Sequence, residues 1–217
     1  MKGLLIKDLR LMKGQKTFFL SVFLIAVVVT AMDNNPDFLL AYLPFVFSFF
    51  TLSTISYDEF DNGNPFFFTL PITRTDYAAE KYLFSLLVST GTLLLTSLCS
   101  VLIWIIKKNC AVSELLLTAG IILPLLILAQ SLMIPIQLKF GGEKGRFVMF
   151  GVFALVCGIV LAADKAAELF GVDLGQLLDT VSALHAGITI PVMIAAAGLL
   201  LLLSLRISIG IMNKKEF

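Results

Sequence analysis

Residues 82–106, YLFSLLVSTGTLLLTSLCSVLIWII, decide the fold of this chain. The run contains no Asp, Glu, Lys, Arg or His, and Lys107 and Lys108 follow it directly. An apolar run of about 17–25 residues is long enough to cross the hydrocarbon core of a bilayer as a helix. The stretch therefore predicts a transmembrane helix that ends at the two lysines.

Five other apolar runs have a comparable character. They cover residues 17–32, 38–56, 115–138, 147–163 and 188–209. Hydrophobic residues make up 59% of the 217-residue chain and charged residues only 14%, against about 25% charged in an ordinary soluble domain. We expect an all-α, polytopic membrane protein with six transmembrane helices, built as a single domain over residues 1–217.

The positions of lysine and arginine predict the orientation. With the N-terminus inside, thirteen of the sixteen Lys and Arg residues fall on the cytoplasmic side, and only Lys107, Lys108 and Lys165 fall outside. Lys and Arg favour the cytoplasmic flanks of spans. We expect a multi-pass protein of the plasma membrane with both termini in the cytoplasm.

Several classes of function have no support in the sequence. Among Asp, Glu, Lys, Arg and His, only Arg206 falls within the six runs, whereas ion-coupled carriers place such residues at membrane depth. A net charge of +1 gives no nucleic-acid signature. Cys99, Cys110 and Cys157 form no CxxC pair. We therefore expect no nucleic-acid partner, no metal site and no catalytic residues, and we do not expect the chain to be an enzyme.

Mildly polar side chains follow one face of residues 82–106, at spacings of three and four. They are Ser85, Ser89, Thr92, Thr96 and Ser100, and the next run adds Gln130 and Gln137. Small and weakly polar residues often form the packing seam between membrane helices. The same face would also suit the wall of a transport pathway, and the sequence leaves both interpretations open.

Two segments outside the spans have amphipathic patterns. In residues 1–16, Leu4, Leu5, Leu9 and Met12 keep helical spacing among lysines and an arginine. This pattern predicts a helix lying on the inner leaflet, with a simple positively charged flank of the first span as the alternative. Residues 164–187 predict a second, extracellular amphipathic segment.

Residues 57–81 form a cytoplasmic segment with an unusual composition. Acidic residues Asp58, Glu59 and Asp61 precede three phenylalanines at 66–68. Exposed aromatic side chains of this kind are typical of a docking surface, although they could also pack against the helix ends. Further on, Thr73 with Asp76 predicts the N-terminus of the next helix.

Two stretches resemble the permease subunits of ABC-2 type exporters. They are residues 1–9, MKGLLIKDL, and residues 70–82, LPITRTDYAAEKY. The chain is most similar to the small bacterial permeases that export phenol-soluble modulins and other antimicrobial peptides. The resemblance implies an N-terminal elbow helix, a dimer (a homodimer where both copies are this chain), an amphipathic or hydrophobic peptide cargo and a separate ATPase. It also implies that the segment after the second span is the ATPase-coupling segment, comprising Asp58, Glu59, Phe60, Phe66, Phe67, Phe68 and Arg74.

The chain has no motif with which to bind a nucleotide itself. GxxxxGK[ST] is absent, and Gly14-Gln15-Lys16-Thr17 lacks its spacing. We therefore expect no cofactor on this chain, and ATP with Mg on the partner. The leading hypothesis is the transmembrane permease subunit of an ATP-driven exporter. The alternative is a stand-alone secondary carrier, a passive channel, or an immunity or scaffold protein.

Overall fold

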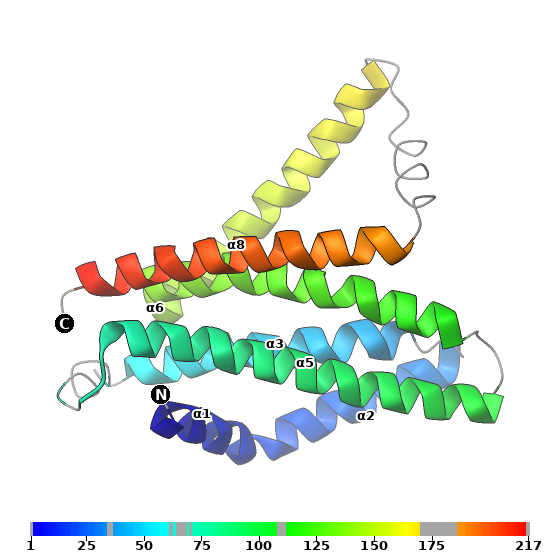
Figure 1. Cartoon of the computed structure of the whole chain (residues 1–217), viewed down its shortest axis with the longest axis horizontal. Helices are drawn as coiled ribbons and strands as arrows, with labels where there is room; N and C mark the ends of the chain where they lie inside the picture. Colours follow the sequence, from blue (N-terminus) through cyan, green and yellow to red (C-terminus); the bar gives the residue numbers. More distant parts are fainter. Residues whose placement is uncertain are drawn as a thin grey trace.

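The structure is a computed structural model that describes residues 2–33, 37–60, 63, 69, 71–107, 112–169 and 186–215. All regular structure in these ranges is helical, as the sequence predicts. The helices are α1 (Lys2–Gly14), α2 (Lys16–Asp33), α3 (Asp37–Glu59), α5 (Arg74–Lys107), α6 (Val112–Leu169) and α8 (Ala186–Lys214), as shown in Figure 1.

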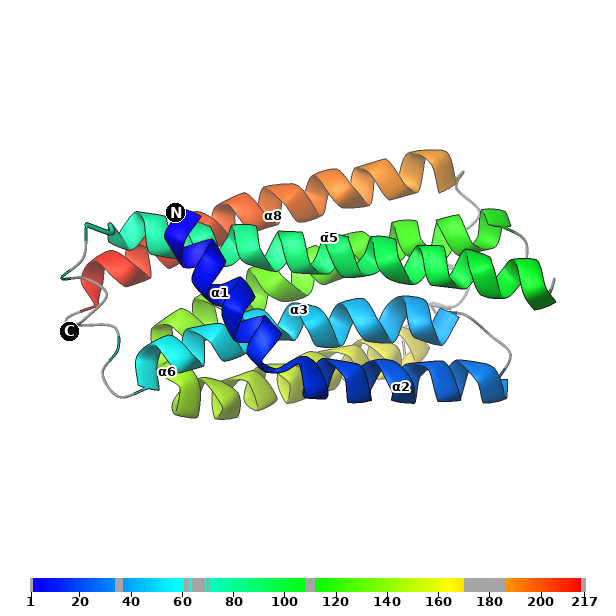
Figure 2. The same ribbon diagram turned by 90° about the horizontal axis from the view of Figure 1, so that it is seen from below.

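The bundle is built from α3, α5, the first half of α6 and α8, which run side by side along its length (Figures 1 and 2). Helix α3 packs against both α5 and α6, α8 packs against α6 and α5, and α2 packs against α3. Helix α1 turns away from α2 by 64° and crosses α5 and α3 obliquely (Figure 2). Both ends of the chain lie at the end of the bundle that carries the α3–α5 connection, which we call the loop end.

Helix α5 begins where its capping residues predict. The Thr73 hydroxyl accepts a hydrogen bond from the Asp76 backbone N–H at 3.0 Å and donates one to the Asp76 carboxylate at 2.6 Å. The Thr73 carbonyl accepts a bond from the Tyr77 N–H at 3.1 Å. A side-chain oxygen at this position satisfies a backbone donor that the first turn of a helix leaves open.

Helix α6 is too long to be one straight span. At about 1.5 Å per residue, its 58 residues would measure nearly three times the roughly 30 Å hydrocarbon thickness. The helix breaks at Gly141, where φ is 79° and ψ is −177°. Beyond the break its second half leaves the bundle at an angle (Figure 1). This half contains residues 147–163, the fifth expected span.

Four helical segments in the described part of the chain are long and apolar enough to cross a membrane: Asp37–Glu59, Arg74–Ile103, Leu115–Gly142 and Thr189–Lys214. Helices α1 and α2 meet this criterion only as a bent pair, which raises the number to five. The protein is therefore a multi-pass helical membrane protein. The expected extracellular segment, residues 164–187, lies largely outside the described residues, because only its first and last few residues belong to α6 and α8.

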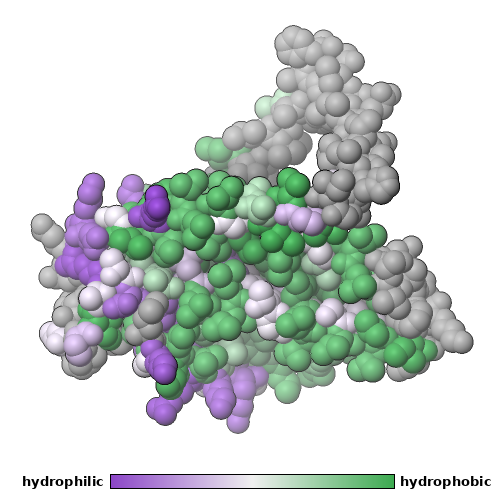
Figure 3. All heavy atoms as spheres, in the orientation of Figure 1, coloured by the Kyte–Doolittle hydropathy of each residue, from purple (hydrophilic) through white to green (hydrophobic). Residues whose placement is uncertain are grey.

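The outer surface of the bundle matches lipid rather than water. On α5, Leu94, Leu95, Leu98 and Leu102 are each more than 60% exposed. A belt of apolar side chains covers most of the visible face, and hydrophilic side chains gather at the loop end and along the lower edge (Figure 3). Since a soluble protein rarely exposes a large continuous apolar surface, this belt is the membrane-facing surface.

Candidate functional site

A cluster of buried charges joins three helices at the loop end. The Lys81 ammonium of α5 lies 2.6 Å from Asp8 Oδ2 of α1 and 2.8 Å from Asp58 Oδ2 of α3. It also donates a hydrogen bond to the Thr54 hydroxyl at 3.1 Å. The side chains of Lys81 and Asp8 are 0% exposed. We call Lys7, Asp8, Asp58 and Lys81 the charge cluster.

Asp58 is the centre of the charge cluster. Besides Lys81, it receives a hydrogen bond from the Tyr77 hydroxyl at 3.0 Å and pairs with Lys7 of α1. Buried charges are tolerated only where they are paired and hydrogen-bonded. The cluster therefore holds the end of α3 against both α1 and the first turns of α5.

Glu80 adds a third acid to this region with fewer contacts. Its side chain is 0% exposed, and the Lys81 ammonium lies 3.7 Å from its Oε2. Among the described residues, neither of its carboxylate oxygens has a hydrogen-bond partner. Three carboxylates thus face two ammonium groups beside the middle of α1.

Glu59 connects the end of α3 to the break in α6. One of its carboxylate oxygens accepts a hydrogen bond from the Gly142 backbone N–H at 2.8 Å, and the other lies 2.6 Å from the Lys215 ammonium. Lys215 also donates to the Leu138 carbonyl at 3.1 Å. Gly142 begins the second half of α6, so the carboxylate sits where a helix N-terminus favours an anion.

Gly141 makes this contact sterically feasible. Its positive φ is unfavourable for a residue with a side chain, and a Cβ at this position would lie 2.6 Å from Glu59 Oε2. The glycine thus provides both the bend in α6 and the space for the Glu59 carboxylate.

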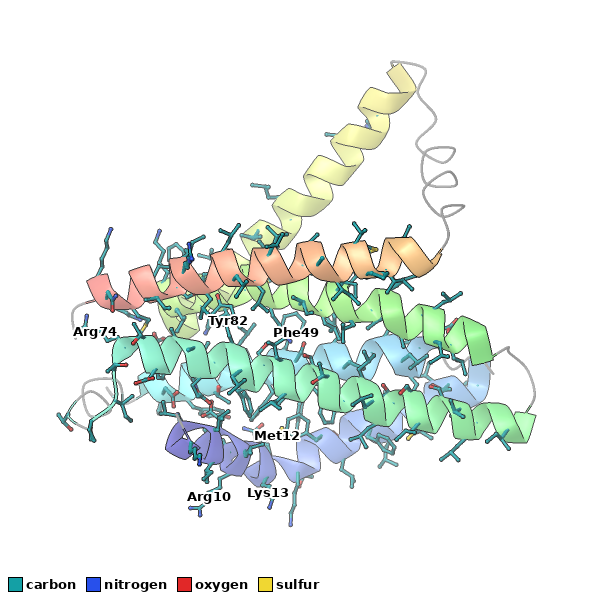
Figure 4. The ribbon with its side chains drawn as sticks, in the orientation of Figure 1. Arg10, Met12, Lys13, Phe49, Arg74 and Tyr82 are labelled. Atoms are coloured by element: carbon teal, nitrogen blue, oxygen red, sulfur yellow. The ribbon has the colours of Figure 1, made fainter. Side chains whose placement is uncertain are left out.

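Arg74 attaches the other end of the α3–α5 connection to α8. Its guanidinium donates to the backbone carbonyls of Met212 at 3.1 Å and Asn213 at 3.0 Å. These carbonyls lie in the last turn of α8, where a cation is favourable. Figure 4 shows Arg74 at the loop end of the bundle and Tyr82 further along α5.

Both ends of the α3–α5 connection are therefore bonded to the rest of the bundle. Asp58 and Glu59 link its start to α1, α5, α6 and the residue after α8, and Arg74 links its end to α8. We call these contacts together the junction. A displacement of this connection would act on five helices through short polar contacts.

The structure places the expected coupling residues in different environments. Asp58 is buried, Glu59 has a side chain 17% exposed, and Phe60 is 73% exposed. Arg74 is half-buried against α8. The phenylalanines 66–68 lie outside the described residues. Of the expected set, Phe60 presents the open surface, whereas Asp58 and Glu59 face inward and bind other helices.

The polar face of α5 lies inside the bundle. Ser85, Ser89, Thr96 and Ser100 are buried, as are Gln130 and Gln137 of α6, and Thr92 is half-buried. The Gln130 amide donates to the Ser85 carbonyl at 3.4 Å, and the Gln137 amide donates to the Ser56 hydroxyl at 2.8 Å. This arrangement matches the packing-seam interpretation, and a role in a transport pathway remains a prediction.

The sequence interpretation did not identify the charge cluster. It treated Lys7 and Lys81 as flanking cations and assigned Asp58 to a docking surface. One signal was available in α1, where Asp8 lies four residues after Leu4 on the face that packs against the bundle. The structure shows Leu9 45% exposed and Asp8 fully buried. A single acid on an otherwise apolar helix face indicates a buried cation nearby.

The fold and the junction define a class of protein: a multi-pass helical membrane protein in which the end of α3 and the start of α5 are bonded to the ends of neighbouring helices. A family model described as "ABC-2 family transporter protein" matches residues 3–213. The chain therefore belongs to the ABC-2 transporter family, as a permease subunit of an ABC transporter, and this family implies a partner ATPase. No curated protein and no solved structure was found to match the chain.

Proposed function

We propose that this chain is the membrane subunit of an ATP-driven exporter, powered by a separate ATPase that docks on the α3–α5 connection. The observation that supports it most is the junction, because Asp58, Glu59 and Arg74 connect that segment to every helix that reaches the loop end. Such contacts are what a permease requires to convert a push on one loop into movement of a bundle.

The proposal includes a particular membrane arrangement. Six spans place both termini in the cytoplasm, with the second half of α6 crossing as the fifth span and α2 as the first. Helix α1 lies at the inner surface as an elbow helix. The thirteen-to-three distribution of Lys and Arg supports this orientation. The 64° bend between α1 and α2 is consistent with an elbow.

The assembled exporter contains two permease copies and two ATPase subunits, with ATP and Mg bound to the ATPases. The cargo is an amphipathic or hydrophobic peptide moving outward. Its support is the resemblance to peptide-exporting permeases and the uncharged polar face of α5, which carries Ser85, Ser89, Thr92, Thr96 and Ser100. The chain itself carries no nucleotide-binding motif and contributes no catalytic residue.

The first experiment separates docking from transmission. The chain is co-expressed with candidate ATPases, and co-purification and ATP hydrolysis are measured. Replacing Phe60 and residues 66–68 with Ala removes the docking surface and is expected to abolish co-purification. The matched control replaces Phe147 and Phe150, which are 82% and 74% exposed on the second half of α6, and is expected to keep it. Equal loss in both variants refutes the docking assignment.

The second experiment tests transmission. Glu59→Gln removes the pairing with Lys215 and weakens the contact to Gly142 while leaving Phe60 in place. We expect the ATPase still to co-purify, but peptide flux per ATP hydrolysed in proteoliposomes to fall severalfold. Peptide flux without any ATPase would instead favour a stand-alone carrier or channel.

A further inference from the structure

A groove with basic edges runs between α6 and α8 at the loop end. It is formed by Lys139 of α6, by Ile207, Gly210, Ile211 and Lys214 of α8, and by Lys215. The groove has a volume of about 500 Å³, within the roughly 300–1,000 Å³ typical of small-molecule sites. It opens on the outside of the bundle, next to Ile207, which is 58% exposed.

The floor of the groove is apolar and its width depends on a glycine. Ile207, Gly210 and Ile211 occupy one face of the last turns of α8. A Cβ added at Gly210 would meet no atom within 4 Å. The absence of a side chain at this position therefore leaves open space rather than allowing two helices to touch.

The charge of the groove is all of one sign. The Lys139 ammonium lies 5.2 Å from the centre of the Phe140 ring, and both Lys139 and Lys214 are exposed. Among the carboxylate side chains that the structure describes, none forms an ion pair with Lys139 or Lys214, while Lys215 pairs with Glu59 at the inner edge. Two ammonium groups on different helices thus flank one apolar channel.

We propose that this groove binds an anionic phospholipid, with the headgroup phosphate between Lys139 and Lys214 and an acyl chain along Ile207. The occupant follows from position and charge. The groove involves the last turns of α8, which lie at the loop end (Figure 1). The apolar belt meets the hydrophilic side chains at that end of the bundle (Figure 3), which is the depth of lipid headgroups. Basic pockets between membrane helices on the cytoplasmic side are suited to anionic headgroups.

The groove lies between α6 and α8, and Lys215, which pairs with Glu59 in the junction, lines one of its edges. A molecule bound in the groove therefore lies next to the junction. A bound lipid bridges Lys139 and Lys214 and so resists separation of the two helix ends. This inference concerns a lipid site and does not depend on the cargo or on the ATPase.

The test is titration of short-chain phosphatidylglycerol into the protein in a neutral detergent, with bound lipid counted by native mass spectrometry. Each lysine near an anionic surface contributes about 1 kcal/mol, so Lys139→Gln with Lys214→Gln is expected to weaken binding by roughly thirtyfold. Lys139→Arg with Lys214→Arg is expected to retain it. Phosphatidylcholine is expected to bind weakly to every variant.

Two further variants separate a groove from general surface charge. Lys13→Gln with Lys16→Gln removes the same charge from exposed positions on α1 and α2 and is expected to bind as the wild type does. Gly210→Leu keeps every charge and fills the channel without a backbone clash, and it is expected to weaken binding at least tenfold. The proposal is overturned if the Lys13 and Lys16 variant loses as much binding as the groove variant, or if Gly210→Leu binds normally.

Other occupants give distinct results. Competition by millimolar inorganic phosphate would show a free-anion site and overturn the assignment to lipid. A change of oligomeric state in Gly210→Leu, without any phosphatidylglycerol binding by the wild type, would assign the groove to a second copy of the chain and likewise overturn it.

Discussion

Two buried polar regions among the described residues differ in whether their hydrogen bonds stay within one helix or join different helices. Along the middle of α5, the Thr92 hydroxyl donates to the Val88 carbonyl at 2.7 Å and the Thr96 hydroxyl to the Leu93 carbonyl at 3.0 Å, both within one helix. At the loop end, Lys81 binds Asp8 of α1 in the charge cluster, and Glu59 binds Lys215 beyond α8 in the junction. The hydroxyls of Thr92 and Thr96 are thus satisfied within their own helix, whereas the charged side chains at the loop end require partners on other helices.

This difference indicates how the bundle divides mechanically. Helices whose polar groups bond internally can slide or separate without losing a hydrogen bond, whereas helices joined by buried ion pairs must move together. We therefore expect the helix ends at the loop end to move together as one rigid unit. The remaining parts of the helices should separate from one another more easily. That division suits a permease, because a force applied to the rigid loop end would then open or close the opposite end of the bundle.

The largest expected effect comes from removing the cation of the charge cluster. Lys81→Met leaves Asp8 and Asp58 with Lys7 as the remaining cation in contact, and it removes the ammonium that lies 3.7 Å from Glu80. Breaking a buried ion pair costs about 3–5 kcal/mol, and thermal or SDS unfolding of the detergent-solubilised protein should show this loss. Adding Asp8→Leu removes one of the two acids that lose their pairing with Lys81, and it should recover part of the lost stability. Wild-type stability in Lys81→Met would contradict the structural role of the cluster.

A smaller effect is expected at the break in α6. Gly141→Ala places a Cβ 2.6 Å from Glu59 Oε2 and a side chain at φ 79°. This change should lower the free energy of unfolding by about 1–3 kcal/mol. Gly151→Ala is the matched control, because a Cβ there meets nothing within 4 Å and alanine favours a helix. Equal stability of the two variants in the same unfolding assay would argue against the contact.

Tyr82 tests the boundary between the two regions. Its hydroxyl lies 2.6 Å from the Ser204 and 2.7 Å from the Ser208 hydroxyls of α8. Hydrogen bonds between membrane helices contribute about 0.6 kcal/mol on average and up to about 1.7, so Tyr82→Phe should lower stability by that order. A double-mutant cycle with Ser208→Ala should show coupling between the two positions, and strictly additive losses would count against the bond.

The smallest effect is expected in the middle of α5. Thr92→Val keeps the shape of the side chain and removes the intrahelical hydrogen bond to the Val88 carbonyl. The free energy of unfolding should therefore change by less than about 0.5 kcal/mol. A loss as large as that of Tyr82→Phe would mean that this face also holds helices together, and the contrast between the two regions would fail.

The sequence predicted most of the helices because their signal is local. Apolar length and capping residues are enough to place α3, α5 and α8, and the Thr73 with Asp76 pattern gives the start of α5. The sequence predicted residues 115–138 and 147–163 as two separate spans. Helix α6 instead continues with a break at Gly141, because Glu59, a residue of another helix, caps the restarting segment.

The charge cluster and the junction could not be predicted in the same way because their partners are far apart in the chain. Lys81 and Asp8 are separated by 73 positions, and Lys215 and Glu59 by 156. The charges of Asp58 and Glu59 were visible in the sequence and indicated a functional segment. Their inward direction depends on where α1, α6 and α8 end, which hydrophobic periodicity does not encode.

The contact between Gly141 and Glu59 has an evolutionary consequence. Because a Cβ at position 141 would collide with the Glu59 carboxylate, the two positions should not vary independently among relatives that share this break. A family member with a larger residue at 141 is expected to carry a shorter residue at 59 and another cap for the helix that begins at Gly142. Covariation between these two columns of an alignment would identify which permeases share this junction.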